Sequence, residues 1–283
     1  MEESRHTNMQ AGSSDFQKWL KGKIWLVATG SLDCFPQSGC PCELCKIAEQ
    51  GGKDRRLCAS SIFYKDCLFD LGPGVWKRIQ NRGVVPKAII LSHAHFDHIS
   101  DLMEWPKISR FFPVYTSVLH RSLFQKLGIR ANYFEPNQPF YMKAIPGFKI
   151  ETKIAVHTFT RPVSLLKFDD IIYAPDLGDL GEGELKFAKG TKLWFGDGFS
   201  LEEDFVLQNE KLHMSMEHLI LKLKNLKGLQ SVIFVGIGHH SKYPHEDLEL
   251  YLKQFDMREN TPFLVELGFD NQILNYGLST KKS

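Results

Sequence analysis

The segment LSHAHFDHIS, residues 91–100, constrains the fold of this chain more than any other stretch. It follows the apolar run KAIILS and contains four potential metal ligands within six positions: His93, His95, Asp97 and His98. In an extended loop, side chains two residues apart point the same way, so the first three can share one side while His98 turns toward another. Imidazole and carboxylate suit zinc and similar ions. A solvated surface loop is the alternative, but such tight clustering after a strand favours a metal site.

The bulk composition is that of a globular protein without a dominant charge. The chain has 283 residues, 43% hydrophobic and 24% charged, with 35 Lys and Arg against 33 Asp and Glu. This balance gives no positive field to attract nucleic acid or an anionic membrane, although nucleic acid stays open as a partner. The N-terminus has no basic segment leading into an apolar run, and the longest apolar runs are strand-sized. We therefore expect no secretory signal, no membrane partner and a cytoplasmic location.

The chain divides into a short polar segment and one large domain. Residues 1–21 are rich in Ser, Gln and charged residues, which predicts a flexible N-terminal tail. Residues 22–283 alternate short apolar runs with amphipathic segments, such as the helical spacing of Met216, Leu219 and Leu223 after Ser215. This predicts a single domain with two strand-rich halves, each backed by helices.

A second candidate metal site lies in a cysteine-rich loop after the apolar run at residues 23–30. Cys40, Cys42 and Cys45 form a C-x-C-x-x-C pattern, and three thiolates can share one zinc ion if a fourth ligand comes from elsewhere. A redox pair or plain loop cysteines are the alternatives. The six cysteines of a cytosolic chain favour thiols or metal ligands over a disulfide framework. Cys67 lies in an alternating strand and is expected to be a small apolar residue, whereas Cys34 and Cys58 show no pattern.

The histidine motif resembles the signature of the metallo-β-lactamase fold superfamily, whose members are hydrolases with an αββα sandwich. The likeness extends from ATGS at residues 28–31 to PHEDLELYL at 244–252. It implies an α/β fold of four layers, with two mixed sheets flanked by helices. It also implies that IAVHT and YAPD supply His157 and Asp176. By this resemblance His93, His95 and His157 hold one metal, Asp97 and His98 face a second, and Asp176 bridges the two.

The cysteine loop narrows the resemblance to the PhnP-like phosphodiesterase branch. The segments ATGSLDCFPQSGCPCELC, RRLCASSIFY and LFDLGPG are similar to that branch. The likeness implies a structural zinc held by Cys40, Cys42, Cys45 and a histidine near the C-terminus, and cleavage of cyclic ribose phosphates or related phosphodiesters. The segment HMS resembles a stretch whose histidine, here His213, lies near the substrate phosphate.

The segment VGIGHH at residues 235–240 departs from the T-H-x-x-H arrangement of the resembled family. Aligned without gaps, the metal-ligand position falls on Gly236 and the structural-zinc histidine on His239. We expect His240 to supply the missing ligand. A weak second site, a one-metal enzyme or loss of catalysis stays open, and His245 is a poorer substitute because it begins a helix.

These observations predict a metal-dependent hydrolase with one structural Zn²⁺ and two divalent catalytic ions, Zn²⁺ or Mn²⁺. The expected reaction is attack of a metal-bound hydroxide on a cyclic phosphate or other small phosphodiester. Asp97 is expected to orient the nucleophile, and His213 to contact the phosphate or protonate the leaving group. An RNA-processing or cofactor-biosynthesis member of the same superfamily, and a non-catalytic zinc-stabilised binding protein, are the alternatives. The substrate, the physiological metal and the oligomeric state stay open, including a homodimer.

Overall fold

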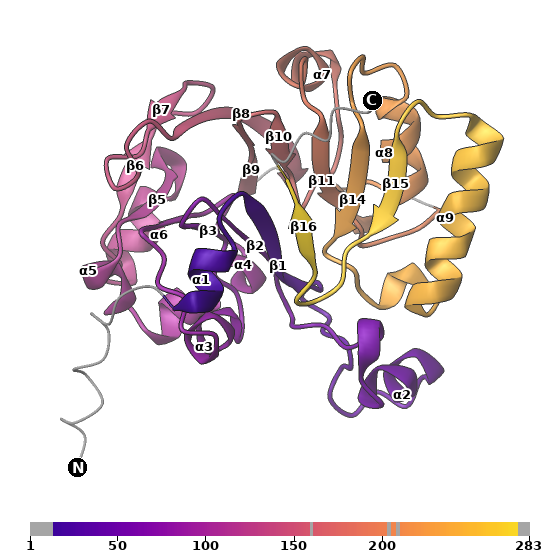
Figure 1. Cartoon of the computed structure of the whole chain (residues 1–283), viewed down its shortest axis with the longest axis horizontal. Coiled ribbons are helices and arrows are strands. Elements are labelled where there is room, and N and C mark those ends of the chain that lie inside the picture. The colour runs from indigo at the N-terminus through magenta and orange to yellow at the C-terminus, as the bar shows by residue number, and fades with distance from the viewer. Residues whose placement is uncertain (1–13, 159–160, 203–204, 208–209, 277–283) are drawn as a thin grey trace.

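The computed structural model describes residues 14–158, 161–202, 205–207 and 210–276 (Figure 1). Within these ranges, two seven-stranded sheets pack face to face. From edge to edge, the first sheet contains β16 (Ile273–Asn275), β1 (Lys23–Thr29), β2 (Ser60–Tyr64), β3 (Cys67–Phe69), β4 (Ala88–Ile90), β5 (Val114–Ser117) and β6 (Asn132–Phe134). The second contains β15 (Leu264–Leu267), β14 (Ser231–Val235), β11 (Leu193–Asp197), β10 (Ile171–Tyr173), β9 (Arg161–Phe168), β8 (Lys149–Thr158) and β7 (Phe140–Tyr141).

Helices cover the outer faces of both sheets, which confirms the predicted αββα sandwich (Figure 1). Both sheets are mixed. In the first, β3, β4 and β5 run parallel whereas β1, β2 and β3 run antiparallel. In the second, β10, β11 and β14 run parallel whereas β8, β9 and β10 run antiparallel. The α-helices are α1 (Asp15–Trp19), α2 (Glu43–Glu49), α3 (Val75–Asn81), α4 (Phe96–Glu104), α5 (Ile108–Phe111), α6 (Arg121–Lys126), α7 (Glu182–Phe187), α8 (Met216–Leu223) and α9 (His245–Glu259). The 3-10 helices are η2 (Gly52–Asp54), η3 (Val118–His120) and η4 (His239–Ser241), and a two-stranded sheet pairs β12 (Phe205–Leu207) with β13 (Glu210–His213).

Strand periodicity explains why three apolar layers form. Along β1, Ile24 and Leu26 face the core between the sheets, whereas Trp25 and Val27 face the helices on the outer side. Such a strand is buried on both faces, so it reads as a continuous apolar run rather than an alternating one. Aromatic rings fill the central layer, and the ring centroids of Phe69 and Phe168 lie 4.4 Å apart. None of the helices in the described ranges is both long and apolar enough to cross a bilayer.

Part of the predicted N-terminal tail belongs to the folded domain. Helix α1 begins after Ser14, whose hydroxyl accepts a hydrogen bond from the Gln17 backbone. The Gln17 side chain also makes two 2.9 Å hydrogen bonds to the Val85 backbone, and Leu20 is buried. The prediction that the tail extends to residue 21 is therefore wrong for residues 14–21. These residues have no apolar run, and hydrogen bonds from the Gln17 side chain to the main chain hold them against the domain. Residues 1–13 lie outside the described residues.

Cys34 and Cys58 form a disulfide, whereas free thiols or metal ligands were expected. An isolated antiparallel β-bridge between Phe35 and Arg56 brings the two loop segments together. The Cα atoms of the two cysteines lie 4.2 Å apart. This long-range pairing leaves no local sequence signal, which is why the expectation was wrong for this pair. Cys67 is buried between the sheets, as expected for a small apolar residue.

Candidate metal centre

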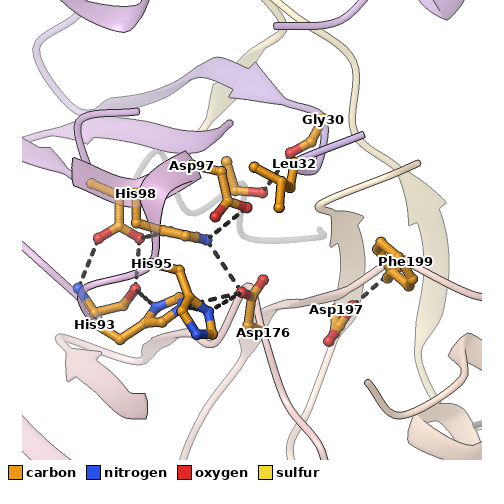
Figure 2. Close-up of polar contacts among 12 residues, drawn as sticks. Gly30, Leu32, His93, His95, Asp97, His98, Asp176, Asp197 and Phe199 are labelled. Atoms are coloured by element: carbon orange, nitrogen blue, oxygen red, sulfur yellow. Dashed lines mark hydrogen bonds and ion pairs between the residues drawn. The ribbon is translucent and has the colours of Figure 1, made fainter. Parts of the chain in front are cut away.

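Strand ends place the predicted ligands side by side (Figure 2). The histidine loop leaves β4, and His95 is the N-cap of α4, so Asp97 and His98 lie in the first turn of that helix. His157 lies near the end of β8, and Asp176 follows β10. The fold therefore brings together residues from the first and the second sheet.

Four of these residues form one compact group. The candidate ligand atoms of His93, His95, His157 and Asp176 all lie within 4.8 Å of one another. The Oδ2 atom of Asp176 lies 3.1 Å from His93 Nε2, 4.0 Å from His95 Nδ1 and 3.7 Å from His157 Nε2. The Nδ1 atom of His95 also lies 2.9 Å and 3.0 Å from the ring nitrogens of the other two histidines. One ring nitrogen cannot be well paired with both by hydrogen bonds, but all three can face one cation.

The protonation states of this group suit a metal ion. Burial lowers the pKa of His93 well below its usual value and lowers the pKa of His157 to about 4. Both imidazoles are therefore neutral near pH 7 and present lone pairs. Burial acts to raise the pKa of Asp176, but the charge of His98 and the hydrogen bonds from the histidines hold it well below the usual range. Neutral imidazoles around an ionised carboxylate are a fitting ligand set for a divalent ion.

A second group shares Asp176. The Nε2 atom of His98 lies 3.3 Å from Asp176 Oδ2 and 3.4 Å from Asp97 Oδ2. This nitrogen is buried, and it has no partner of proper hydrogen-bond geometry among the described residues. Burial acts to lower the pKa of His98, but the charges of Asp97, Asp176 and Asp70 outweigh it and raise the pKa well above its usual value. The surroundings of His98 therefore favour positive charge, which a second metal ion would supply.

Asp70, which was not predicted as a site residue, orients His98. Its carboxylate accepts hydrogen bonds from the Ser92 amide and hydroxyl, both at 2.7 Å, and from His98 Nδ1 at 2.8 Å. Fixing the proton on Nδ1 leaves the lone pair of Nε2 for a metal. The sequence signal that could have identified Asp70 was an acidic residue directly after the apolar run CLF. Because β3 and β4 are parallel neighbours, Asp70 lies at the same sheet edge as the histidine loop.

His213 lies beside the first group, at the end of β13. Its Nδ1 atom is 2.7 Å from Asp197 Oδ2, and its ring centroid is 4.9 Å from that of His157. Burial acts to lower the pKa of His213, but the charge of Asp197 and its hydrogen bond raise that pKa to about 9. Asp197 also accepts hydrogen bonds from the amides of Leu177 and Phe199 (Figure 2). Asp197 ends β11 and was missed, although an acid that ends a buried strand was the signal.

His240 does not join the candidate catalytic groups of the described residues, so its predicted role as the replacement ligand is wrong. Its side chain is 45% exposed, its Nε2 atom lies 3.7 Å from Asp33, and its ring packs near Phe199. It belongs to η4, a 3-10 helix whose geometry carries it away from the centre. Position 236 does face the centre, because a Cβ atom there would lie 4.0 Å from Asp176 Oδ1. The missing ligand of the second site is therefore a feature of this chain.

The cysteine loop, which follows β1 in the chain, forms a separate group. The ligand atoms of Cys40, Cys42, Cys45 and His239 lie within 4.8 Å of one another. The Sγ atom of Cys45 is 2.8 Å from His239 Nε2, and burial raises the pKa of Cys45 to about 11. Hydrogen bonding from the Cys45 backbone lowers the pKa of Cys42, which caps α2. Three thiols and one imidazole match the ligands of a structural zinc site. They link the α2 loop, which projects from the sandwich in Figure 1, to the segment after β14.

Comparisons with known proteins agree with this geometry. The model of the β-lactamase superfamily domain matches residues 63–237, more than half of the chain. The chain belongs to the metallo-β-lactamase superfamily. A crystal structure of a diphosphatase from the PhnP family is 19% identical, with a TM-score of 0.67 over 89% of this chain and 96% of that one. Zn²⁺-bound PqqB from Methylobacterium extorquens is 16% identical, with a TM-score of 0.69 over 89% and 99% of the two chains.

One curated relative differs in name from these metallo-β-lactamase superfamily structures. An octanoyltransferase of Porphyromonas gingivalis is 21% identical over 249 residues, which cover 80% of this chain. The matched part is 48% of that protein, so the chain spans about half the length of the curated relative. At these identities the solved structures show a shared fold. Membership of the superfamily, together with the ligand groups, implies divalent metal binding.

Proposed function

We propose that this member of the metallo-β-lactamase superfamily is a metal-dependent hydrolase of small phosphodiesters. The observation that carries the proposal is the pair of ligand groups that share Asp176. Similarity to a diphosphatase from the PhnP family, and the thiol-rich group that accompanies the centre, support a phosphoric ester as substrate.

The ligand sets fit two divalent ions of unequal affinity. His93, His95, His157 and Asp176 would hold one ion, and Asp97, His98 and Asp176 a second, with Zn²⁺ or Mn²⁺ suited to both. Because Gly236 adds no ligand, the second site is expected to bind its ion more weakly. Bound divalent ions lower the pKa of a coordinated water and offset charge on phosphate oxygens.

The residues around the centre supply orientation and a proton. Asp70 holds the His98 ring in one tautomer, and Asp97 is proposed to orient the nucleophilic water in addition to binding metal. His213 is proposed to donate a hydrogen bond or a proton from Nε2 to the substrate phosphate or leaving oxygen. The Asp197 carboxylate that faces Nδ1 keeps this imidazole protonated and fixes its ring.

The cysteine group, Cys40, Cys42, Cys45 and His239, has a structural role in this proposal. A zinc ion on Cys40, Cys42, Cys45 and His239 would fasten the loop after β1 to the segment after β14. Such a tie contributes to folding stability because the ligands converge only in the folded state.

Gly236 also favours a second candidate, a one-metal enzyme or a non-catalytic binding protein. Its backbone faces Asp176 where a ligand side chain would otherwise stand. The fold shared with Zn²⁺-bound PqqB supports a cofactor-biosynthesis role as a further alternative. Metal content and phosphodiesterase activity together separate these candidates.

Hydrolysis of bis(p-nitrophenyl) phosphate tests the proposal, with 2′,3′-cyclic nucleotides as a second substrate class. His95→Ala removes a ligand of the first group and is expected to lower kcat/KM about a hundredfold or more, with the circular dichroism spectrum unchanged. His240→Ala is the matched control, because His240 lies outside the candidate catalytic groups, and it is expected to keep the rate. Full activity of His95→Ala would refute the assignment of the site.

A further inference from the structure

A cavity adjoins the histidine loop on the side of α4 and α6. Its volume is about 450 Å³. Side chains from three segments line it, including Phe96, Met103, Leu119, Leu123, His120 and Pro162. With the exception of His120, every lining residue is apolar. Cavities of this size with apolar walls and few polar atoms are typical of small-molecule sites.

The walls of the cavity keep large apolar side chains in contact with solvent. Phe96, Met103, Leu119 and Leu123 are all exposed, although each belongs to a residue type that is normally buried. Single exposed hydrophobic residues are ordinary, but several around one hollow mark a binding site. Covering them with a hydrocarbon group would remove apolar surface from water.

His120 is the one polar residue among the residues that line this cavity. The residue is 8% exposed, and its Nδ1 atom lies 3.0 Å from the Thr116 hydroxyl. Its Nε2 atom is buried and makes no hydrogen bond with the described residues. Burial lowers the pKa of His120 to about 4, against the opposing effect of the Pro162 carbonyl, so the ring is neutral near pH 7. The ring therefore adds a neutral surface to the wall of the cavity, and its Nε2 atom is closed to solvent.

The cavity and the candidate metal centre share the same loop. Ala94 and Phe96, which line the cavity, are the neighbours of His95 in the chain, and His95 is a ligand of the first group. The charge of His95 also affects the pKa of His120. The cavity therefore lies against the loop that carries the candidate ligands, on the side to which Ala94 and Phe96 point.

We infer that this cavity binds a hydrocarbon substituent of the substrate, an alkyl chain or a phenyl ring. This inference rests on the proposed hydrolase function and names the substrate class, a phosphoric ester with an apolar group. A sugar or a nucleobase fits the walls poorly. Either would bury several polar atoms where the lining offers one polar side chain, and each unpaired atom is unfavourable.

Calorimetric titration of the metal-loaded protein with methyl phosphate and hexyl phosphate tests the inference without requiring turnover. Each methylene that enters the cavity increases affinity about threefold, so hexyl phosphate is expected to bind more than about tenfold tighter than methyl phosphate. Leu123→Glu places a charge on the wall at a 37% exposed position and is expected to abolish this preference. Leu221→Glu, at a 44% exposed position on α8 outside the cavity, is the matched control and is expected to retain it.

The hydrolysis of p-nitrophenyl methyl and p-nitrophenyl hexyl phosphate separates this inference from the proposed function. A hexyl preference in kcat/KM that Leu123→Glu abolishes supports both. Tighter binding of hexyl phosphate without hydrolysis of either ester supports the cavity and refutes the phosphodiesterase. Equal affinity for the two phosphates, or a preference that survives Leu123→Glu, overturns the inference. Sedimentation in which Leu123→Glu converts a dimer to a monomer would also overturn it, because a second copy would then occupy the cavity.

Discussion

The substitution Gly236→His restores a side chain at the incomplete second site and tests how far that site is built. The position follows β14 with a φ of 74°, and a Cβ atom there would lie 4.0 Å from Asp176 Oδ1. An imidazole on that Cβ can approach the ion that Asp97 and His98 are proposed to hold. Gly236→Ala is the control, because it introduces the same backbone strain without a ligand.

The magnitude follows from the backbone and from mass action. A non-glycine residue in the left-handed region costs about 1–2 kcal/mol, and the Cβ contacts of 3.3 Å to Pro175 and 3.4 Å to Ser60 add crowding. Both variants are therefore expected to lose about 1–2 kcal/mol of unfolding free energy in the metal-depleted state. If the imidazole binds the second ion about tenfold tighter, excess metal returns about 1.4 kcal/mol to Gly236→His alone.

Urea unfolding with and without Mn²⁺, together with calorimetric Mn²⁺ titration, measures both quantities. The expected result is a tighter second binding event in Gly236→His than in the wild type or in Gly236→Ala. Identical titrations of the two variants would refute the reasoning, because position 236 would then not face a metal site.

Three further predictions concern Asp70, His245 and Cys42. The Asn side chain of Asp70→Asn cannot accept all three hydrogen bonds, so this variant is expected to bind Mn²⁺ about 10- to 100-fold more weakly in calorimetry. Unchanged affinity would contradict the role given to Asp70. Burial lowers the pKa of His245 to about 3, so the unfolded chain binds a proton that the folded one rejects as pH falls below about 6.5. Stability should fall by about 2 kcal/mol from this group between pH 7 and 5, and His245→Gln should lose that slope in urea unfolding. Cys42→Ser should lose one zinc per chain by elemental analysis and melt at lower temperature; retained zinc would remove Cys42 from the site.

The local sequence was sufficient to predict the candidate ligands that follow one strand directly. His93, His95, Asp97 and His98 fall within six positions, so strand-loop geometry alone brings them together. His157 and Asp176 are far from that loop in the chain and could be placed only through the resemblance to a family. The structure confirms the predicted αββα sandwich and brings these residues within reach of one another.

The missed features depend on contacts between distant segments. Asp70 bonds to residues 22 and 28 positions away, and Asp197 to a histidine on a different strand, so neither has a local signature. The prediction for His240 was wrong because it relied on the closeness of His240 to Gly236 in the chain. The turn of η4 decides where the His240 ring lies. The cavity beside His120 is likewise assembled from three separate segments.

Metal analysis of the purified protein tests the central claim most directly. The account predicts, in protein prepared without chelators and replete with Zn²⁺ or Mn²⁺, one ion bound by the cysteine group and at least one further ion that His95→Ala removes. A chain that holds only the thiolate-bound ion after repletion, with His95→Ala indistinguishable from the wild type, would contradict it.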